Sequence, residues 1–208
     1  MTEQRNLDSV IESQAASDGA GVKLRRSLGS RQGLYLDPFL MLDEFYSDDP
    51  DDYIAGFPPH PHRGFETVTY MLEGRMRHED HLGNTGELGP GGVQWMTAGR
   101  GVIHSEMPQQ AEGRMRGFQL WINLPAAEKM QAAAYRDIPA DAIPERALEG
   151  GRIRIIAGPL EVGDERIAGP VNPAAGSMYT DPRYLDLRLE TGAEVEIPLA
   201  AGHNAFVY

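Results

Sequence analysis

Cysteine is absent from this chain of 208 residues. Its absence excludes disulfide bonds, zinc sites built on thiolates and catalysis by a cysteine nucleophile. Any metal that the chain binds must therefore be held by nitrogen and oxygen atoms.

Positive charge and long apolar runs are also scarce. The 19 Lys and Arg are outnumbered by 31 Asp and Glu, which gives a formal net charge of -12, and so acidic a chain repels the phosphate backbone of DNA or RNA. No apolar stretch reaches the length of a membrane span. Because 41% of the residues are hydrophobic, enough for a buried core, we expect a soluble, cytoplasmic globular protein that binds neither nucleic acid nor membranes.

Glycine and proline, by contrast, are abundant, with 24 and 15 residues spread along the chain. They separate short apolar alternations, a rhythm that is typical of an antiparallel sandwich or barrel. We predict an all-β fold, with one short helix over 126–135, where good helix formers follow Pro125. The segments in which residue types most favour strands are 22–28, 67–72, 92–96, 117–124, 152–156 and 184–189.

Two short motifs place metal-binding side chains at alternate positions, His60-Pro61-His62 and His104-Ser105-Glu106. In a strand, residues i and i+2 lie on one face. If the two strands face each other inside a barrel, three imidazoles and one carboxylate converge, a set that suits a divalent first-row transition metal. Pro61 lacks an N–H and predicts an edge strand or a bulge beside this site.

A second carboxylate, that of Glu66, shares the parity of His60 and His62 and would also point into the barrel if the strand were regular. Spacing leaves open whether Glu66 or Glu106 binds the metal, and whether either acts as a base beside it. The remaining histidines are interpreted as ordinary surface or core residues; they are His78, His81 and His203.

The end of the chain alternates again over 193–197 and 204–208, as a strand would. The segment 205–208 aligns weakly with 67–70, which suggests a second barrel that lacks the metal ligands. We predict a metal-binding N-terminal barrel over 1–140, and over 141–208 a linker followed by the opening part of a C-terminal barrel that is incomplete in this chain.

Several sequence blocks in the first 125 residues or so resemble the pirin family of the cupin superfamily. The resemblance implies a bicupin, two stacked antiparallel β-barrels or jelly rolls, with a single iron in the N-terminal barrel. Carried over residue by residue, the family's metal ligands fall on His60, His62, His104 and Glu106. The blocks are Leu36-Asp37-Pro38-Phe39, Asp43-Glu44-Phe45, 60–67, His78-Glu79-Asp80, 94–101 and His104-Ser105-Glu106-Met107-Pro108.

The same resemblance implies a quercetin 2,3-dioxygenase, which opens the central ring of a flavonol with dioxygen and releases carbon monoxide. Iron(II) is the expected metal, with manganese, nickel, cobalt, zinc or copper as alternatives, and Glu106 is a candidate base for the 3-hydroxyl proton. The resemblance also allows a non-enzymatic iron redox sensor that binds a transcription regulator or a metabolic enzyme. A structural zinc is the third alternative, and we expect a monomer.

Overall fold

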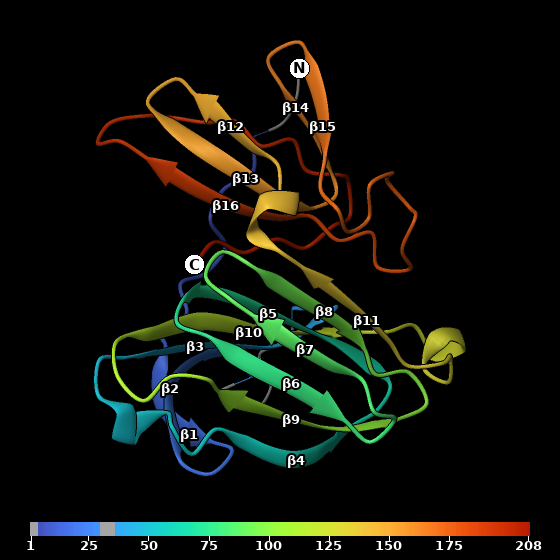
Figure 1. Cartoon of the computed structure of the whole chain (residues 1–208). Helices are drawn as coiled ribbons and strands as arrows, with labels where there is room; N and C mark the ends of the chain where they lie inside the picture. The colour runs from blue at the N-terminus through green and yellow to red at the C-terminus, as the bar shows by residue number, and fades with distance from the viewer. Residues whose placement is uncertain (1–3, 30–35) are drawn as a thin grey trace.

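The computed structural model describes residues 4–29 and 36–208 and confirms the predicted all-β fold (Figure 1). Within these ranges the chain forms sixteen β-strands, no α-helix and three 3-10 helices, which are Pro50–Asp52, Ala126–Glu128 and Ala140–Ala142. None of the helices found in the described residues is long and apolar enough to cross a membrane.

Two antiparallel sheets face each other and enclose the first core (Figure 1). Met71 and Phe45 of the larger sheet pack there against Met76 and Leu88 of the smaller one. The larger sheet has the order β1 (Gln14–Asp18), β2 (Val22–Leu28), β3 (Phe39–Ser47), β10 (Met115–Asn123), β5 (Phe65–Glu73), β8 (Val93–Thr97) and β11 (Ala134–Ile138). The smaller has the order β4 (Phe57–His62), β9 (Val102–Pro108), β6 (Met76–Asp80) and β7 (Thr85–Leu88).

Strand β5 lies in the larger sheet between β10 and β8 and presents different residues to each side. Because successive side chains of a strand point to opposite faces, Thr69 and Met71 face the smaller sheet, whereas Val68 and Tyr70 face away from it. The strand is buried on both sides. It separates the space between the two sheets from the apolar core on the outer face of the larger sheet.

The later part of the chain packs on the outer face of the larger sheet (Figure 1). Here Ile156 and Val171 join a core with Val68 and Trp95. The strands of this part are β12 (Glu145–Leu148), β13 (Gly151–Ala157) and β16 (Tyr184–Leu189) in one sheet, and β14 (Pro159–Val162) and β15 (Glu165–Ala168) in a hairpin. The division of the chain into domains 1–140 and 141–208 stays a prediction.

All six predicted strand segments coincide with or overlap strands of the structure, and 22–28 and 184–189 agree at both ends with β2 and β16. The predicted helix over 126–135 is wrong. Only Ala126–Glu128 forms a 3-10 turn, and Ala134 already begins β11. Pairing of β11 with β8, and packing of Tyr135 on Met96, outweigh the helix propensity of the alanines.

The strand expected at the end of the chain is also wrong, because residues 193–208 form no strand. Two side chains near the end of the segment instead contact β3. The Phe206 ring packs edge-on against Phe39 at 4.8 Å, and the Tyr208 hydroxyl donates a hydrogen bond of 2.7 Å to Glu44. Phe206 and Tyr208 thus contact β3 without forming a strand, and the weak alignment with 67–70 has no structural counterpart.

Candidate metal centre

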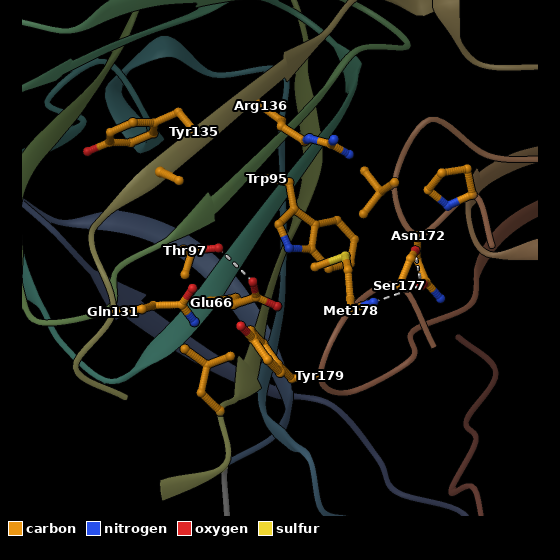
Figure 2. Close-up of a pocket in the computed structure, with 14 residues that line it drawn as sticks. Glu66, Trp95, Thr97, Gln131, Tyr135, Arg136, Asn172, Ser177, Met178 and Tyr179 are labelled. Carbon is orange, nitrogen blue, oxygen red and sulfur yellow. Dashed lines mark hydrogen bonds between the residues drawn. The ribbon is translucent and has the colours of Figure 1, made fainter. Parts of the chain in front are cut away.

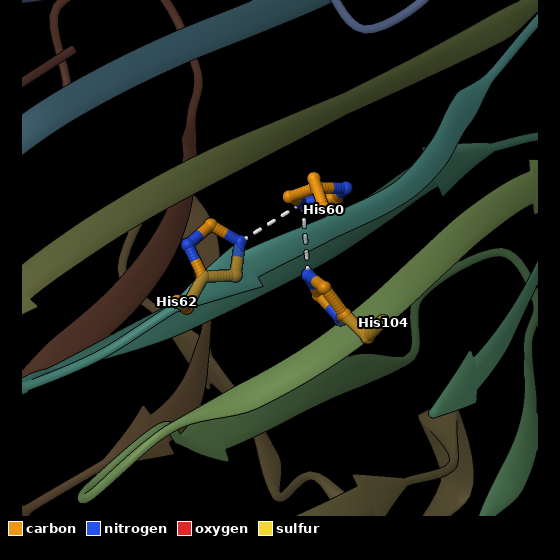
Figure 3. A group of neighbouring side chains, drawn as sticks. All are labelled: His60, His62 and His104. Carbon is orange, nitrogen blue, oxygen red and sulfur yellow. Dashed lines mark hydrogen bonds between the residues drawn. The ribbon is translucent and has the colours of Figure 1, made fainter. Parts of the chain in front are cut away.

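Strands β4 and β9 bring the histidines together as antiparallel neighbours, with His60 directly opposite His104. Strand β4 lies at the edge of its sheet, which confirms the prediction from Pro61. It also contains Pro58 and Pro59, and an edge strand is the place where missing N–H groups cost no ladder bonds. Figure 3 shows the three imidazoles converging from the two strands.

The three ring nitrogens of the cluster are close enough to share one ion. Nε2 of His60 lies 2.9 Å from Nε2 of His62 and 3.0 Å from Nε2 of His104 (Figure 3). His62 and His104 are buried, and His60 is half-buried. The structure therefore brings together these three predicted residues as a group that could hold a metal ion.

The backbone fixes which nitrogen of His60 carries the proton. Its Nδ1 lies 2.8 Å from the carbonyl oxygen of Pro58. Because a carbonyl can only accept, Nδ1 must donate, and Nε2 of the neutral ring then has a free lone pair. Such a contact between the second ring nitrogen and a backbone carbonyl is the usual support of a metal-binding histidine.

Glu106 follows His104 by two residues on β9 and points the same way, as the period of a strand requires. Its Oε2 lies 4.0 Å from Nε2 of His104. Its Oε1 accepts a hydrogen bond of 3.2 Å from the Thr69 hydroxyl, and Gln119 lies beside both groups. Glu106 is 4% exposed, so solvent cannot stabilise the negative charge of its carboxylate. A nearby cation would stabilise it.

Burial decides the protonation of the cluster. Together with the neighbouring imidazoles it lowers the pKa of His62 to about 4 and that of His104 to about 2. Both rings are neutral at pH 7, the form that binds metals. Burial raises the pKa of the Glu106 carboxyl, and His60 acts in the opposite direction.

His78 lies beside this site and is a buried core residue, which agrees with one of the two interpretations made from the sequence. Its Nδ1 lies 3.1 Å from Nδ1 of His104, on the side of the ring away from the other histidines, and its side chain is buried. A lone histidine carries no local signal. His78 reaches the site because β6 pairs with β9, which places it opposite Glu106.

Glu66 does not belong to the site, and the expectation that it points into the barrel is wrong. The chain turns at Gly64, which adopts a left-handed conformation with φ of 79°, and passes from the smaller sheet to the larger one. This turn breaks the parity that relates Glu66 to His62. Its carboxyl accepts a hydrogen bond from Thr97 on the far face of the larger sheet.

Two aromatic side chains flank the cluster. The rings of Phe65 and Trp121 each lie 5.2 Å from the His62 ring, close to perpendicular to it. They pack on each other with 4.7 Å between ring centroids. The side of the site next to His62 is thus apolar and aromatic.

Comparison with known proteins places the chain in a family. Residues 21–122 match the family model described as Pirin, and the whole chain is 54% identical to 72% of a Pseudomonas aeruginosa protein named "Putative quercetin 2,3-dioxygenase". The chain belongs to the pirin family. Human Pirin is 39% identical over the whole chain, which covers 67% of the human protein.

A similar solved structure agrees with the fold. The crystal structure of a quercetin 2,3-dioxygenase from Acinetobacter baumannii matches 85% of the chain with a TM-score of 0.71 and 36% identity. The match spans 62% of that protein, so the chain corresponds to rather less than two thirds of its length.

Proposed function

We propose that His60, His62, His104 and Glu106 bind one divalent metal, iron(II) in the cell, and that the chain carries the active site of a flavonol 2,3-dioxygenase. The observation that carries this proposal is the convergence of three Nε2 atoms, two of them within 3.0 Å of the third, beside a buried carboxylate. The names of the Pseudomonas and Acinetobacter relatives support the substrate class.

The donor set suits an octahedral ion such as iron(II), which would keep positions open for reactants, whereas the structural zinc considered from the sequence would have four filled tetrahedral positions.

The donor set leaves room for reactants. Three neutral imidazoles and one carboxylate reduce the charge of a divalent ion to +1, and an octahedral ion would keep two positions open. Manganese, nickel, cobalt, zinc and copper accept the same nitrogen and oxygen donors, so competition among metals is a property to measure. The second ring nitrogens of His60 and His104, held by Pro58 and His78, orient the imidazoles toward the ion.

When bound, iron(II) supplies an electron to dioxygen and a Lewis acid for the 3-hydroxyl oxygen of the flavonol. The reaction adds both atoms of dioxygen at C2 and C4, breaks the two carbon–carbon bonds of C3 and releases C3 with its oxygen as carbon monoxide. Glu106, the carboxylate beside His104, would accept the 3-hydroxyl proton if its bond to the metal loosens. The aromatic side formed by Phe65 and Trp121 packs against a flat substrate.

The decisive experiment measures oxygen uptake by the full-length, iron(II)-loaded protein with quercetin, and carbon monoxide in the same sample. We expect stoichiometric uptake and release in the wild type, none in His62→Ala, and wild-type rates in His203→Ala, which removes an exposed histidine outside the cluster. Metal analysis of each sample confirms its iron content.

No uptake by a protein with bound iron would contradict the dioxygenase. The iron redox sensor would then be the better hypothesis. It predicts that a transcription regulator or metabolic enzyme is recovered by the protein under one redox condition, reducing or oxidising, and not under the other.

A further inference from the structure

Thr69 places a buried hydroxyl group between the two sheets. The residue is 3% exposed, and Met71, the next residue of β5 on the same face, packs in an apolar core. Burying a hydroxyl costs free energy unless the group forms hydrogen bonds, whereas valine has almost the same shape and favours strands. A hydroxyl at this position therefore needs partners.

Glu106 and Gln119 are these partners. Oγ1 of Thr69 lies 3.2 Å from Oε1 of Glu106 and 2.6 Å from Oε1 of Gln119. Gln119 lies directly opposite Thr69 on the neighbouring strand β10, so the two side chains share one face of the larger sheet. Gln119 also forms a hydrogen bond with Glu106. Two side chains of the larger sheet thus hold a carboxyl group that belongs to β9 of the smaller sheet.

These contacts distinguish the two oxygens of Glu106. Oε1 is the oxygen beside Thr69, whereas Oε2 lies 4.0 Å from Nε2 of His104. The last side-chain torsion of a glutamate has only broad preferences, so the side chain alone does not fix the direction in which each oxygen points. Fixing one oxygen fixes the other.

We propose that Thr69 is a positioning residue for Glu106: its hydroxyl, supported by Gln119, holds Oε1 so that Oε2 is directed toward the metal. This inference rests on the proposed ligand set. Thr69 is not itself a ligand and acts through Glu106. The same contact keeps the carboxylate in place when its bond to the metal loosens, as the role of Glu106 as a base requires.

Thr69→Val tests the proposal, because it removes the hydroxyl and keeps the shape of the side chain. The affinity of the full-length protein for cobalt(II) is measured by equilibrium dialysis, and the visible absorption of the bound ion reports on its ligands. Thr69→Ser keeps a hydroxyl. Thr97→Val is the matched control, because Thr97 donates a hydrogen bond of 2.7 Å to Glu66 on the outer face of the same sheet (Figure 2).

We expect Thr69→Val to bind cobalt(II) roughly 10- to 100-fold more weakly than the wild type, the usual effect of losing a group that orients a metal ligand, and to change the absorption spectrum. Thr69→Ser should recover most of the affinity, and Thr97→Val should bind as the wild type does. In Glu106→Gln, the additional change Thr69→Val should have little effect, because the residue through which Thr69 acts is already altered. Thermal melts confirm that each variant is folded.

The proposal is overturned if folded Thr69→Val has the affinity and spectrum of the wild type while Glu106→Gln binds more weakly. It is also overturned if Thr69→Val causes the same loss in Glu106→Gln as in the wild type, or if Thr97→Val loses as much affinity. Wild-type affinity in Glu106→Gln would remove Glu106 from the ligand set, and this proposal with it. No flavonol is present in the test, so a failure of the dioxygenase reaction leaves its result unchanged.

Discussion

Nδ1 of His78 lies 3.1 Å from Nδ1 of His104, and both rings are buried. One of the two nitrogens must donate its N–H to the other. If Nε2 of His104 binds the metal, its Nδ1 donates, and His78 accepts. The orientation of His104 then depends on a residue that itself lies outside the predicted ligand set.

Replacing His78 therefore tests how the site is held. We expect His78→Ala to weaken metal binding roughly 10- to 100-fold, the usual effect of losing the partner of a metal-binding histidine. His78→Gln should recover part of the loss, because its amide oxygen can accept from His104. Equilibrium dialysis against buffered iron(II) measures both. Wild-type affinity in His78→Ala would show that His104 needs no such partner.

Replacing Glu106 and replacing Glu66 should have different effects on the metal content of the protein. Glu106→Gln should lower the amount of iron bound after dialysis, because it removes the negative oxygen 4.0 Å from His104 Nε2. Glu66→Gln should retain the wild-type amount, because this residue faces the other side of the sheet. Both are measured by metal analysis of folded protein. Equal retention in the two variants would remove Glu106 from the ligand set.

Acid should destabilise the metal-free protein. The pKa of His62 falls from an ordinary value of 6.5 to about 4 on folding, so the unfolded chain binds more protons between these two values. The contribution of His62 to the free energy of unfolding is constant well above pH 6.5 and falls as the pH drops toward 4. At pH 5 it is about 1–2 kcal/mol lower than at neutral pH.

Urea denaturation at pH 7 and pH 5 checks this expectation. The loss of stability should be smaller in His62→Gln, which has no group to titrate there, and unchanged in the exposed variant His203→Ala. An identical loss in His62→Gln and in the wild type would assign the effect to other groups.

A buried tyrosine links the two parts of the chain. The Tyr70 hydroxyl on β5 donates a hydrogen bond of 2.7 Å to Asp186 on β16 and accepts one of 2.7 Å from Arg154 on β13. Tyr70→Phe leaves both charged groups without this partner, and we expect a loss of about 1.5–3 kcal/mol in the free energy of unfolding. Chemical denaturation measures it. Tyr46→Phe, at an exposed ring, is the control and should change little.

The sequence alone was enough to predict which residues share a face where they are related by the two-residue repeat of one strand. His60 and His62, and likewise His104 and Glu106, are related by the two-residue period of a strand, and the three imidazoles come together once β4 and β9 pair. Glu66 shows where such reasoning stops. A left-handed turn at Gly64 lies between it and His62, and parity does not survive a turn between sheets.

The contact of His78 with His104 could not be predicted from the sequence for a different reason. Its place beside His104 depends on the pairing of β6 with β9, a contact between segments that no local pattern announces. The helix expected over 126–135 failed similarly, because pairing of β11 with β8 decides the conformation there. Interactions between distant segments, not residue preferences, determine these parts of the molecule.

The prolines of β4 have a consequence for how the protein behaves among its own copies. An edge strand offers unpaired N–H and C=O groups, to which a strand of another molecule can add. At Pro58, Pro59 and Pro61 no N–H exists, so an incoming strand cannot form a continuous ladder. The edge that carries His60 and His62 can thus stay exposed without becoming a starting point for aggregation.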